Sequence, residues 1–398
     1  MAARYYLWVW RTLMLSAELF CGCGGLALGM SRAGFEHVVL AEWNNDAVTT
    51  LLHNKKRRIK HIAQWPVTGV TDVRDVSWTS HAGKIRVVSG GPPCQPFGIG
   101  GKKRGHEDDR DMWPEAIRAV RETRPDAFLF ENVRNLAGPR FQSYLEWIAL
   151  HLRHPDVVRR GNETYAGHLE RLSHIGREGD YRVHIQVVNA ADYGAPQIRH
   201  RVLIFGIASD LNIIPDTMKP THSRDRLLWD QYVTGTYWDR HGMPCKQPPK
   251  TGPNASRIAK LKARKNEPEG RPWVTVRDAL MGLGEPDGVN NHVMQSGARV
   301  YPGHTGSPMD LPAKALKAGD HGVPGGENMA VRDDGSVRYF TTREAARLVG
   351  LPDNYVFPRS WTESMRQLGN AVPTQLGEAA GLWIRHFLMQ ADKLQHAA

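Results

Sequence analysis

A cysteine held between prolines is the residue of this sequence best suited to nucleophilic chemistry. Cys94 lies in the run Gly-Gly-Pro-Pro-Cys-Gln-Pro-Phe over residues 90–97, directly after a strand-like apolar segment. Prolines stiffen the backbone around the thiol, and the preceding glycines leave room for a substrate. A thiolate must be positioned and partly accessible in order to attack. Most cysteines are buried structural residues, but a rigid loop at the carboxyl edge of a sheet favours a nucleophile here.

Two segments near the N-terminus could hold a nucleotide-like ligand. Residues 20–25, Phe-Cys-Gly-Cys-Gly-Gly, follow an apolar strand and open a helix whose first N–H groups are free for a ligand. Glu42 and Trp43 end the next strand, where a carboxylate can accept both ribose hydroxyls and an indole can stack on a purine. A tight turn, a solvated Glu and a half-buried Trp would explain the same residues. NAD would also fit, although the glycine spacing departs from the dinucleotide fingerprint. Together, the two segments favour an adenosyl-type ligand.

An acid and two arginines follow later strands. Glu131 ends a strand in Phe-Glu-Asn-Val, and Gln-Ile-Arg-His-Arg over residues 197–201 places Arg199 and Arg201 on one face of an extended segment. Paired guanidiniums suit a phosphate or a base oxygen. The alternatives are an acid that caps a surface turn and arginines that contact solvent or a carboxylate.

The elements that must position these residues alternate between strand-like and helix-like patterns. Strands are expected at 13–20, 37–41, 84–89, 127–130, 183–188 and 202–207, with helical patterns up to residue 51 and over 112–122 and 141–153. This alternation predicts an α/β domain with a mostly parallel sheet covered on both faces. The segment 189–201 is too short for a helical crossover, so the last two strands should pair antiparallel.

The pattern changes after about residue 210. Residues 211–335 are rich in Gly, Pro, Asn and charge, whereas helical patterns return at 342–349 and from 376 to about 393. We therefore expect an α/β domain over 14–210, a smaller irregular domain over 211–335 and a C-terminal return over 336–398 that completes the first domain.

The charge balance indicates an anionic partner. The 398 residues carry a net charge of +11, although many basic proteins bind no polyanion. Seven basic residues and no acidic one lie between residues 246 and 265, which is typical of either a solvated face or a surface that follows phosphates. Lys260, Lys262 and Arg264 are the expected phosphate contacts, and Arg257, Lys260 and Arg264 would share one face of a helix.

Cysteine use and the N-terminus predict a cytoplasmic protein. Four cysteines are too few for a disulfide scaffold. Cys21 and Cys23 have no neighbouring Cys/His cluster to complete a tetrahedron, so no metal is expected. The first apolar run has only six residues before Arg11, too few for a signal peptide or a membrane span, and Met14 is an alternative start.

Six short motifs, taken in order, resemble the motif set of the DNA (cytosine-5) methyltransferase family. Each one is weakly diagnostic, but six at suitable spacing are specific. The resemblance covers about 14–210 and 336–380. The motifs are Phe-Cys-Gly-Cys-Gly-Gly at 20–25, Glu-Trp at 42–43, Pro-Cys-Gln at 93–95, Glu-Asn-Val at 131–133, Gln-x-Arg-x-Arg at 197–201 and Gly-Asn-Ala-Val-Pro at 369–373.

This resemblance implies a Rossmann-like methyltransferase domain that binds S-adenosylmethionine, a smaller target-recognition domain and double-stranded DNA as substrate. The Cys94 thiolate would add to C6 of a flipped-out cytosine, so that C5 attacks the methyl group. Glu131 would bind N3 and the exocyclic amine, and Arg201 would bind O2. Arg199 would hold the loop or the target nucleotide. A base would then take the C5 proton, and Cys94 would be eliminated.

The resemblance also assigns the cofactor contacts. Four residues would line the methionine part, Glu42 would take the ribose and Trp43 the adenine ring, while Asp72, after the expected third strand, would meet the adenine amine. Pro93, Asn370 and Val372 would close the pocket, and Gln95 would contact DNA beside the nucleophile. The four residues at the methionine part are Phe20, Gly22, Gly24 and Gly25.

The sequence departs from the family at a few positions. Cys21 and Cys23 stand where small residues such as Ala are frequent, and both fit sterically. Gly98 replaces a usual Ser in the loop after the nucleophile, which could alter loop closure or rate. Ala315 stands where Thr is frequent, so that a backbone or DNA contact could be lost.

The sequence allows three alternative functions. The first is the same chemistry on transfer RNA, against which the large variable region 211–335 favours duplex DNA. The second is a DNA-binding module without activity, against which stand intact Cys94, Glu131 and Arg201. The third is a nicotinamide oxidoreductase, in which the Pro-Cys-Gln loop has no role. We expect a monomer without a membrane association, and a restriction endonuclease acting on the same site could accompany it.

Overall fold

A six-stranded sheet is the centre of the protein. The computed structural model describes residues 13–93, 111–302, 305–318 and 328–397. The strands are β1 (Leu15–Leu19), β2 (Glu36–Ala41), β3 (Val87–Gly90), β4 (Ala127–Val133), β5 (Tyr181–Asn189) and β7 (His200–Ala208). Their order is β2-β1-β3-β4-β7-β5. The first four run parallel, whereas β7 is antiparallel to both β4 and β5. The predicted mostly parallel sheet and the antiparallel final pair are both confirmed.

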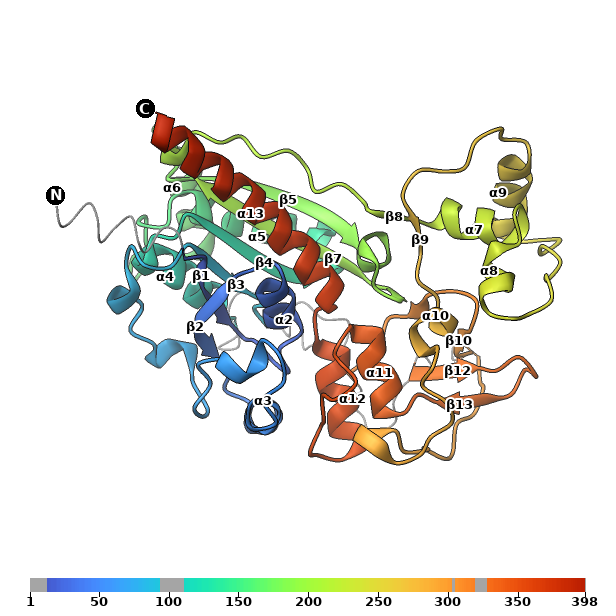
Figure 1. Ribbon diagram of the computed structural model, residues 1–398. Coiled ribbons are helices and arrows are strands. Elements are labelled where there is room, and N and C mark those ends of the chain that lie inside the picture. The colour runs from blue at the N-terminus through green and yellow to red at the C-terminus, as the bar shows by residue number, and fades with distance from the viewer. Residues whose placement is uncertain (1–12, 94–110, 303–304, 319–327, 398) are drawn as a thin grey trace.

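Helices cover both faces of this sheet, as Figure 1 shows. One face packs on α2 (Gly25–Arg32) and α13 (Thr374–Ala397), and the other on α4 (Trp113–Thr123), α5 (Gln142–Arg153) and α6 (Tyr165–Ser173). Successive side chains of a strand point to opposite faces. Within β4, Leu129 therefore joins the core under α13, while Phe128 and Phe130 join the core under α4 and α5.

The C-terminal part of the chain returns to the first domain. α11 (Thr342–Val349) lies where the sequence predicts it, and Thr341 and Glu344 form a reciprocal capping box at its start. α12 (Trp361–Asn370) follows, and the 24-residue α13 then runs along α2 (Figure 1). This return brings residues near 370 to the start of α2.

The segment between β7 and α11 has three parts. Residues 211–218 lie along the edge strand β5, where Leu211, Ile213 and Met218 join the core of the sheet. A helical lobe then follows, which we define as residues 222–272. Its helices are α7 (Arg224–Tyr232), α8 (Thr236–Arg240) and α9 (Pro253–Lys262). Two short strands connect the lobe to the rest, β8 (His222–Ser223) and β9 (Arg271–Pro272).

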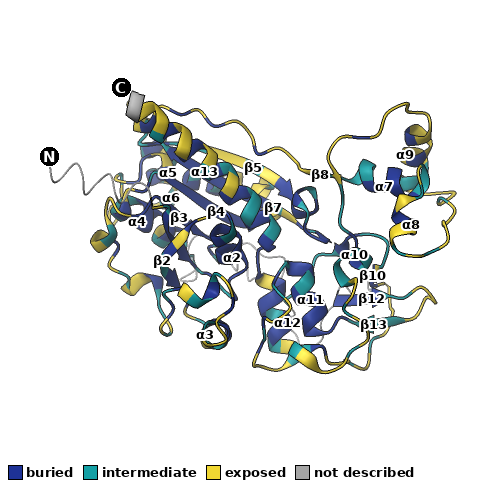
Figure 2. Cartoon of the chain, viewed as in Figure 1, coloured by how far each residue is buried: buried dark blue, intermediate teal, exposed yellow. Residues whose placement is uncertain are grey.

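The lobe stands apart from the sheet and has a small core of its own (Figures 1 and 2). Leu228 and Trp229 of α7 pack on Ile258 and Leu261 of α9, which leaves the other side of α9 exposed. Apolar residues at this spacing on a helix form one buried stripe. The outward face of α9 is thus free to carry charge.

The third part packs against the C-terminal return. It contains α10 (Val276–Leu280), β10 (Ser307–Pro308), β11 (Ala313–Lys314), β12 (Met329–Val331) and β13 (Val337–Tyr339). β11 pairs with β6 (Gln197–Ile198), so residues after 313 run close to the sheet. Ala313 and Leu316 share one core with α11 and α12. No helix among the described residues combines the length and apolar character needed to cross a membrane.

Candidate active site

A cavity of about 550 Å³ opens at the edge of the sheet where β1, β2, β3 and β4 end. Ligands of open α/β folds bind at this edge because the loops that follow parallel strands converge there. Most of the residues singled out from the sequence line this cavity: Phe20, Gly22, Gly25, Glu42, Trp43, Pro93, Glu131, Arg199, Arg201, Asn370 and Val372. Ala315, at which the sequence departs from the family that it resembles, lines it too.

Apart from the three expected phosphate contacts, four expected site residues are not among the described lining residues. Cys94 and Gln95 lie outside the described residues, as does Gly98, although Pro93 brings the chain to the cavity wall. Gly24 caps α2 with φ 81°, and a Cβ there would lie 2.6 Å from the ring of Trp65. Its role in the structure is therefore to allow the turn and the close packing.

Asp72 is the fourth of these residues. It does not end a strand, as the sequence had suggested, but caps the 3-10 turn Val73–Asp75. Its carboxylate accepts hydrogen bonds from the backbone N–H and the guanidinium of Arg74, which lower its pKa. The structure therefore turns this carboxylate toward Arg74, and it is not part of the cavity wall.

The glycine-rich loop is shaped by the C-terminal return. Phe20 and Gly22 have φ 57° and 54°, in the left-handed region. A Cβ on Gly25 would lie 2.3 Å from the carbonyl oxygen of Val372. Glycine is therefore required where the two segments touch, and this contact explains how motifs nearly 350 residues apart build one wall.

Glu42 sits at the tip of β2 with both carboxylate oxygens engaged. Oε2 accepts from Gly22 N at 2.8 Å and Oε1 from Asn44 N at 2.7 Å. Burial raises its pKa, while these hydrogen bonds oppose the rise. A carboxylate can accept about four hydrogen bonds, so lone pairs stay free for two further donors. Beside it, Trp43 is 64% exposed, so its ring can accept a stacking partner.

The acid and the second arginine of the sequence analysis form an ion pair. In the antiparallel pair β4–β7, Glu131 lies opposite Leu203, and Arg201 is two residues from Leu203 on the same face. Arg201 Nε contacts Glu131 Oε1, and Glu131 is only 8% exposed. Two neighbouring strands therefore fix a carboxylate and a guanidinium side by side in the cavity wall.

Arg199 has a different position. Its buried guanidinium donates to Leu316 O at 3.0 Å and to Gly369 O at 2.5 Å. It therefore ties together two segments of the wall that are distant in sequence. Asn132 acts similarly on the loop that leads to residue 94, because its side-chain N–H donates to Pro92 O at 3.0 Å.

Cys21 and Cys23 are poor nucleophiles. Both line the cavity but are buried, and burial raises the pKa of the Cys23 thiol to about 12 and that of Cys21 well above its usual value. Thiols of this kind stay protonated at neutral pH. Within the described ranges, no three His, Cys, Asp or Glu side chains gather in a way that could hold a metal ion.

Several lining residues were not found from the sequence. Glu18 lies in the middle of the buried strand β1, where burial raises its pKa to about 8. An acid in an otherwise apolar strand is a signal that could have been used. Arg366 donates to Asn44 Oδ1 at 3.1 Å, and Gln367 is buried with Oε1 lacking a partner among the described residues. No local sequence pattern predicts that Arg366 and Gln367 line the cavity.

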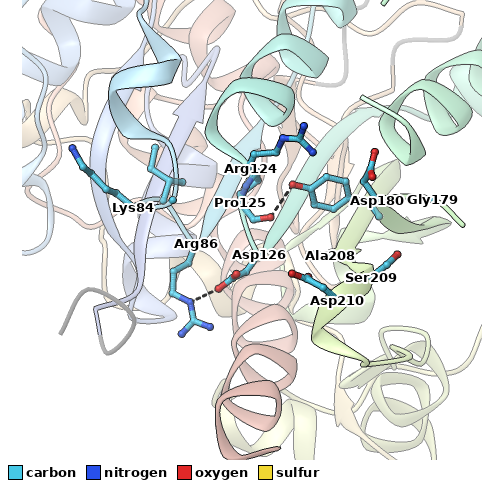
Figure 3. A pocket seen from close by; sticks show the side chains of 13 residues that line it. Lys84, Arg86, Arg124, Pro125, Asp126, Gly179, Asp180, Ala208, Ser209 and Asp210 are labelled. Atoms are coloured by element: carbon cyan, nitrogen blue, oxygen red, sulfur yellow. Dashed lines mark hydrogen bonds and ion pairs between the residues drawn. The ribbon is translucent and has the colours of Figure 1, made fainter. Parts of the chain in front are cut away.

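A second cavity, of about 480 Å³, lies at the opposite edge of the sheet (Figure 3). Its most buried charge is Arg86, which is paired with Asp126 at 2.7 Å and with Asp392 at 2.8 Å. None of the residues expected in the site lines it. The ion pairs already satisfy Arg86, so this cavity is a weaker candidate.

The basic residues between 246 and 265 differ in secondary structure and in ion pairing. α9 confirms a helix through Lys260, but it ends at Lys262, so Arg264 lies beyond the helix and does not share its face as expected. Lys246 forms an ion pair with Asp310, and Arg257 forms one with Asp225, so both positive charges are already balanced within the protein. The three expected phosphate contacts, Lys260, Lys262 and Arg264, are exposed.

Comparisons with known proteins agree with this arrangement. The model of the family described as C-5 cytosine-specific DNA methylase matches residues 14–385. The chain is 28% identical to the type II methyltransferase M.NgoMIV of Neisseria gonorrhoeae, over 92% of this chain and 95% of that protein. It is 30% identical to M.PspPI of Psychrobacter sp., over 94% and 80% of the two chains. The fold is similar to that of S. pombe Dnmt2 methyltransferase, with TM-score 0.55, 16% identity and coverage of 95% and 99%.

Proposed function

Since the chain belongs to the C-5 cytosine-specific DNA methylase family, we propose that it methylates C5 of a flipped-out cytosine within a specific duplex sequence, through a covalent bond between Cys94 and C6. The family's reaction is DNA cytosine-5 methylation with S-adenosylmethionine as the methyl donor. The observation that carries the proposal is the Glu131–Arg201 pair, which faces the same cavity as Glu42, Trp43 and the end of the loop leading to Cys94.

The residues at the β1 and β2 ends suit S-adenosylmethionine. Glu42 can still accept hydrogen bonds from two ribose hydroxyls, and exposed Trp43 can stack on adenine. The buried Oε1 of Gln367 has no donor among the described residues, so a ligand could supply one. Phe20, Gly22 and Gly25 would surround the methionine part, with Pro93, Asn370 and Val372 completing the wall. When bound, this cofactor supplies an electrophilic methyl group.

The remaining wall suits a cytosine ring. Glu131 can bind N3 and the exocyclic amine, while Arg201 can donate to O2, because both are held at adjacent strand positions. These groups withdraw electrons from the ring, so the Cys94 thiolate can form a bond to C6. Carbon C5 then becomes the nucleophile. After methylation, a base accepts the C5 proton and the S–C6 bond breaks, which restores the thiolate and the aromatic ring.

The burial of Glu131 supports base flipping. Glu131 is 8% exposed and lies in the wall of the cavity, where a base stacked in a duplex cannot reach it. The catalytic and cofactor-binding part would comprise 14–210 together with 336–398, and 211–335 would recognise the target. Its partner would be duplex DNA, bound by a monomer. The type II names of its relatives support a companion restriction endonuclease.

The experiment that tests this function is expression in a host without cytosine methylation, followed by sequencing of 5-methylcytosine. We expect methylation at one short sequence. Methylation of transfer RNA and not of DNA would support the RNA alternative. Purified protein that transfers labelled methyl to neither would refute the proposal.

The cofactor residues lead to a first prediction. Glu42→Ala and Trp43→Ala should each weaken S-adenosylmethionine binding by about 1–3 kcal/mol, because a charge-assisted hydrogen bond or a ring contact is lost. Isothermal calorimetry measures this affinity. Glu36→Ala, at the exposed start of the same strand, is the matched control and should bind normally. Unchanged affinity in both site variants would move the cofactor elsewhere.

The helical lobe leads to a second prediction. Replacing Lys260, Lys262 and Arg264 with Ala should weaken binding to all duplexes alike and lower the salt slope by up to about one unit per lost phosphate contact. Lys84→Ala, at the opposite edge of the sheet, controls for charge loss alone. An unchanged salt dependence of DNA binding in the triple variant would show that these three residues do not contact DNA phosphates.

Base contacts, unlike phosphate contacts, should specify the target. Exchange of 211–335 with the equivalent block of a relative should therefore change which sequence is methylated. A chimera that folds, methylates and keeps the original target would place recognition outside this block.

A further inference from the structure

We propose that Asp310 is a positioning residue that fixes the helical lobe relative to the catalytic cavity, so that a target sequence bound by the lobe presents its cytosine to that cavity. This inference rests on the proposed function and deepens it, because it names a residue that couples recognition to the catalytic site. The lobe stands apart from the sheet and connects to it through β8 and β9 (Figure 1). These strands have two residues each, and a short two-stranded ribbon is marginally stable by itself. A fixed orientation of the lobe therefore requires a second attachment.

Asp310, in the turn between β10 and β11, supplies such an attachment. Its carboxylate accepts hydrogen bonds from two residues of the lobe, from Tyr237 Oη at 3.0 Å and from Lys246 Nζ at 2.7 Å. Its backbone carbonyl accepts from Gln231 Nε2 of α7 at 2.7 Å. Tyr237 and Gln231 are both buried, and a buried donor that loses its acceptor is costly. One residue outside the lobe thus holds three separate positions within it.

The backbone around Asp310 is itself fixed on α10. Arg277 N donates to Met309 O at 2.8 Å, and Val276 N donates to Leu311 O at 2.9 Å, so the residues on both sides of Asp310 are bonded to this helix. Arg277 Nε also donates to the Asp310 carboxylate at 2.7 Å. Burial alone would raise the pKa of Asp310, but the hydrogen bonds that it accepts outweigh this effect and lower the pKa. The carboxylate is therefore charged at neutral pH and can bind both cations.

The chain segment that begins at Asp310 continues into the wall of the catalytic cavity. Residues 315–318 line this cavity. Between them and Asp310, β11 pairs with β6, which directly precedes Arg199. Hydrogen-bonded segments of this kind carry coupling between two sites when both sites depend on the same position. The lobe and the cavity are thus joined by one short segment, 310–318.

Asp333 provides a matched control. It lies in the turn between β12 and β13 and contacts the same two cations, Arg277 at 2.6 Å and Lys246 at 3.1 Å. Its side chain is 48% exposed, compared with 18% for Asp310, so its ion pairs should contribute less. Asp333→Asn removes an equal charge beside the same cations, but it leaves the hydrogen bond between Tyr237 and Asp310 in place.

The test uses the full chain, a duplex with the target found by 5-methylcytosine sequencing, and duplexes with one other base pair of that target changed. The measured quantity is discrimination, the ratio of kcat/KM on the target duplex to kcat/KM on an altered duplex. We expect Asp310→Ala to lower this ratio about tenfold, because hydrogen bonds between charged groups are lost. The loss should fall on the target duplex, since only correct recognition uses the fixed orientation. Asp310→Asn, which keeps an acceptor for Tyr237, should lose less, and Asp333→Asn should behave as wild type.

Lys246 separates this role from a general loss of stability. Lys246→Met should also lower discrimination, and the double variant with Asp310→Ala should lose little more than the larger single loss, because both changes remove one contact. Weaker binding of Lys246→Met to all duplexes alike would instead indicate a phosphate contact and would overturn the inference.

Two further results would also contradict it. An Asp310→Ala variant that loses affinity for S-adenosylmethionine, or that slows equally on target and altered duplexes, would show that Asp310 serves only the stability of the fold. Active wild type together with unchanged discrimination in both Asp310 variants would refute only the Asp310 assignment. Wild-type protein that methylates no DNA would refute the proposed function itself.

Discussion

Replacement of Cys94 by alanine is expected to abolish methyl transfer while leaving S-adenosylmethionine binding nearly intact. Without a thiolate at C6, carbon C5 stays a poor nucleophile, and loss of an enzyme's nucleophile commonly costs about 10⁴-fold or more in rate. Transfer of labelled methyl to duplex DNA measures the loss, and calorimetry checks the cofactor site. Cys245→Ala is the matched control, since this thiol is exposed in the helical lobe.

The covalent step can be observed directly. DNA with 5-fluorocytosine at the target should trap a complex that resists denaturation, because the fluorine at C5 cannot leave as a proton does. Cys94→Ala should form no such complex. Cys21 and Cys23 cannot substitute for it, since burial holds the pKa of both thiols far above neutral pH. If wild type methylates ordinary DNA yet yields no adduct, the covalent mechanism is wrong for this protein.

Glu131→Gln should reduce kcat by about 10²–10⁴-fold with a smaller effect on the KM for DNA. A carboxyl group can share a proton with N3 as negative charge builds up on the ring during attack by the thiolate, whereas an amide of the same size cannot, and contributions of this kind fall in that range. Single-turnover methylation separates the chemical step from binding. Thermal unfolding confirms that the variant is folded.

The ion pair with Arg201 allows a stricter version of this test. Arg201→Ala should also reduce kcat, and the double variant should lose much less than the product of the two single losses, because both side chains act on one ring. Independent losses would indicate that the two residues serve different steps. A Glu131→Gln variant with a normal rate would remove Glu131 from the chemistry.

Much of the architecture could be predicted because its signals are local. Apolar runs predicted the six strands of the sheet within a few residues, and acid near the start of α11 marked that helix. The chain segment between β5 and β7 is too short for a helix, so their antiparallel pairing also followed. Motifs placed directly after parallel strands must gather at one edge of the sheet, which is why most expected residues line one cavity.

Two predictions were wrong because they misplaced the end of a strand or of a helix. Asp72 was placed after a strand, but the backbone there forms a 3-10 turn and its carboxylate pairs with Arg74. Arg264 was placed on a helix that ends at Lys262. Element ends depend on capping and on neighbouring segments, which periodicity does not encode.

The sequence by itself indicated the chemistry available to this protein: a thiol between prolines, a carboxylate and two arginines after strand-like segments, and an acid beside an indole, all in the order of one enzyme family. Which of these groups meet was decided only by tertiary structure. Arg201 forms an ion pair with Glu131, whereas Arg199, two residues away, donates hydrogen bonds to the carbonyls of Leu316 and Gly369. Strand alternation gives both arginines the same face, but the partner of Arg201 lies on the neighbouring strand β4, whereas the carbonyl partners of Arg199 come from segments more than 100 residues distant. Such contacts arise from the packing of whole segments, and no local pattern of residues carries that information.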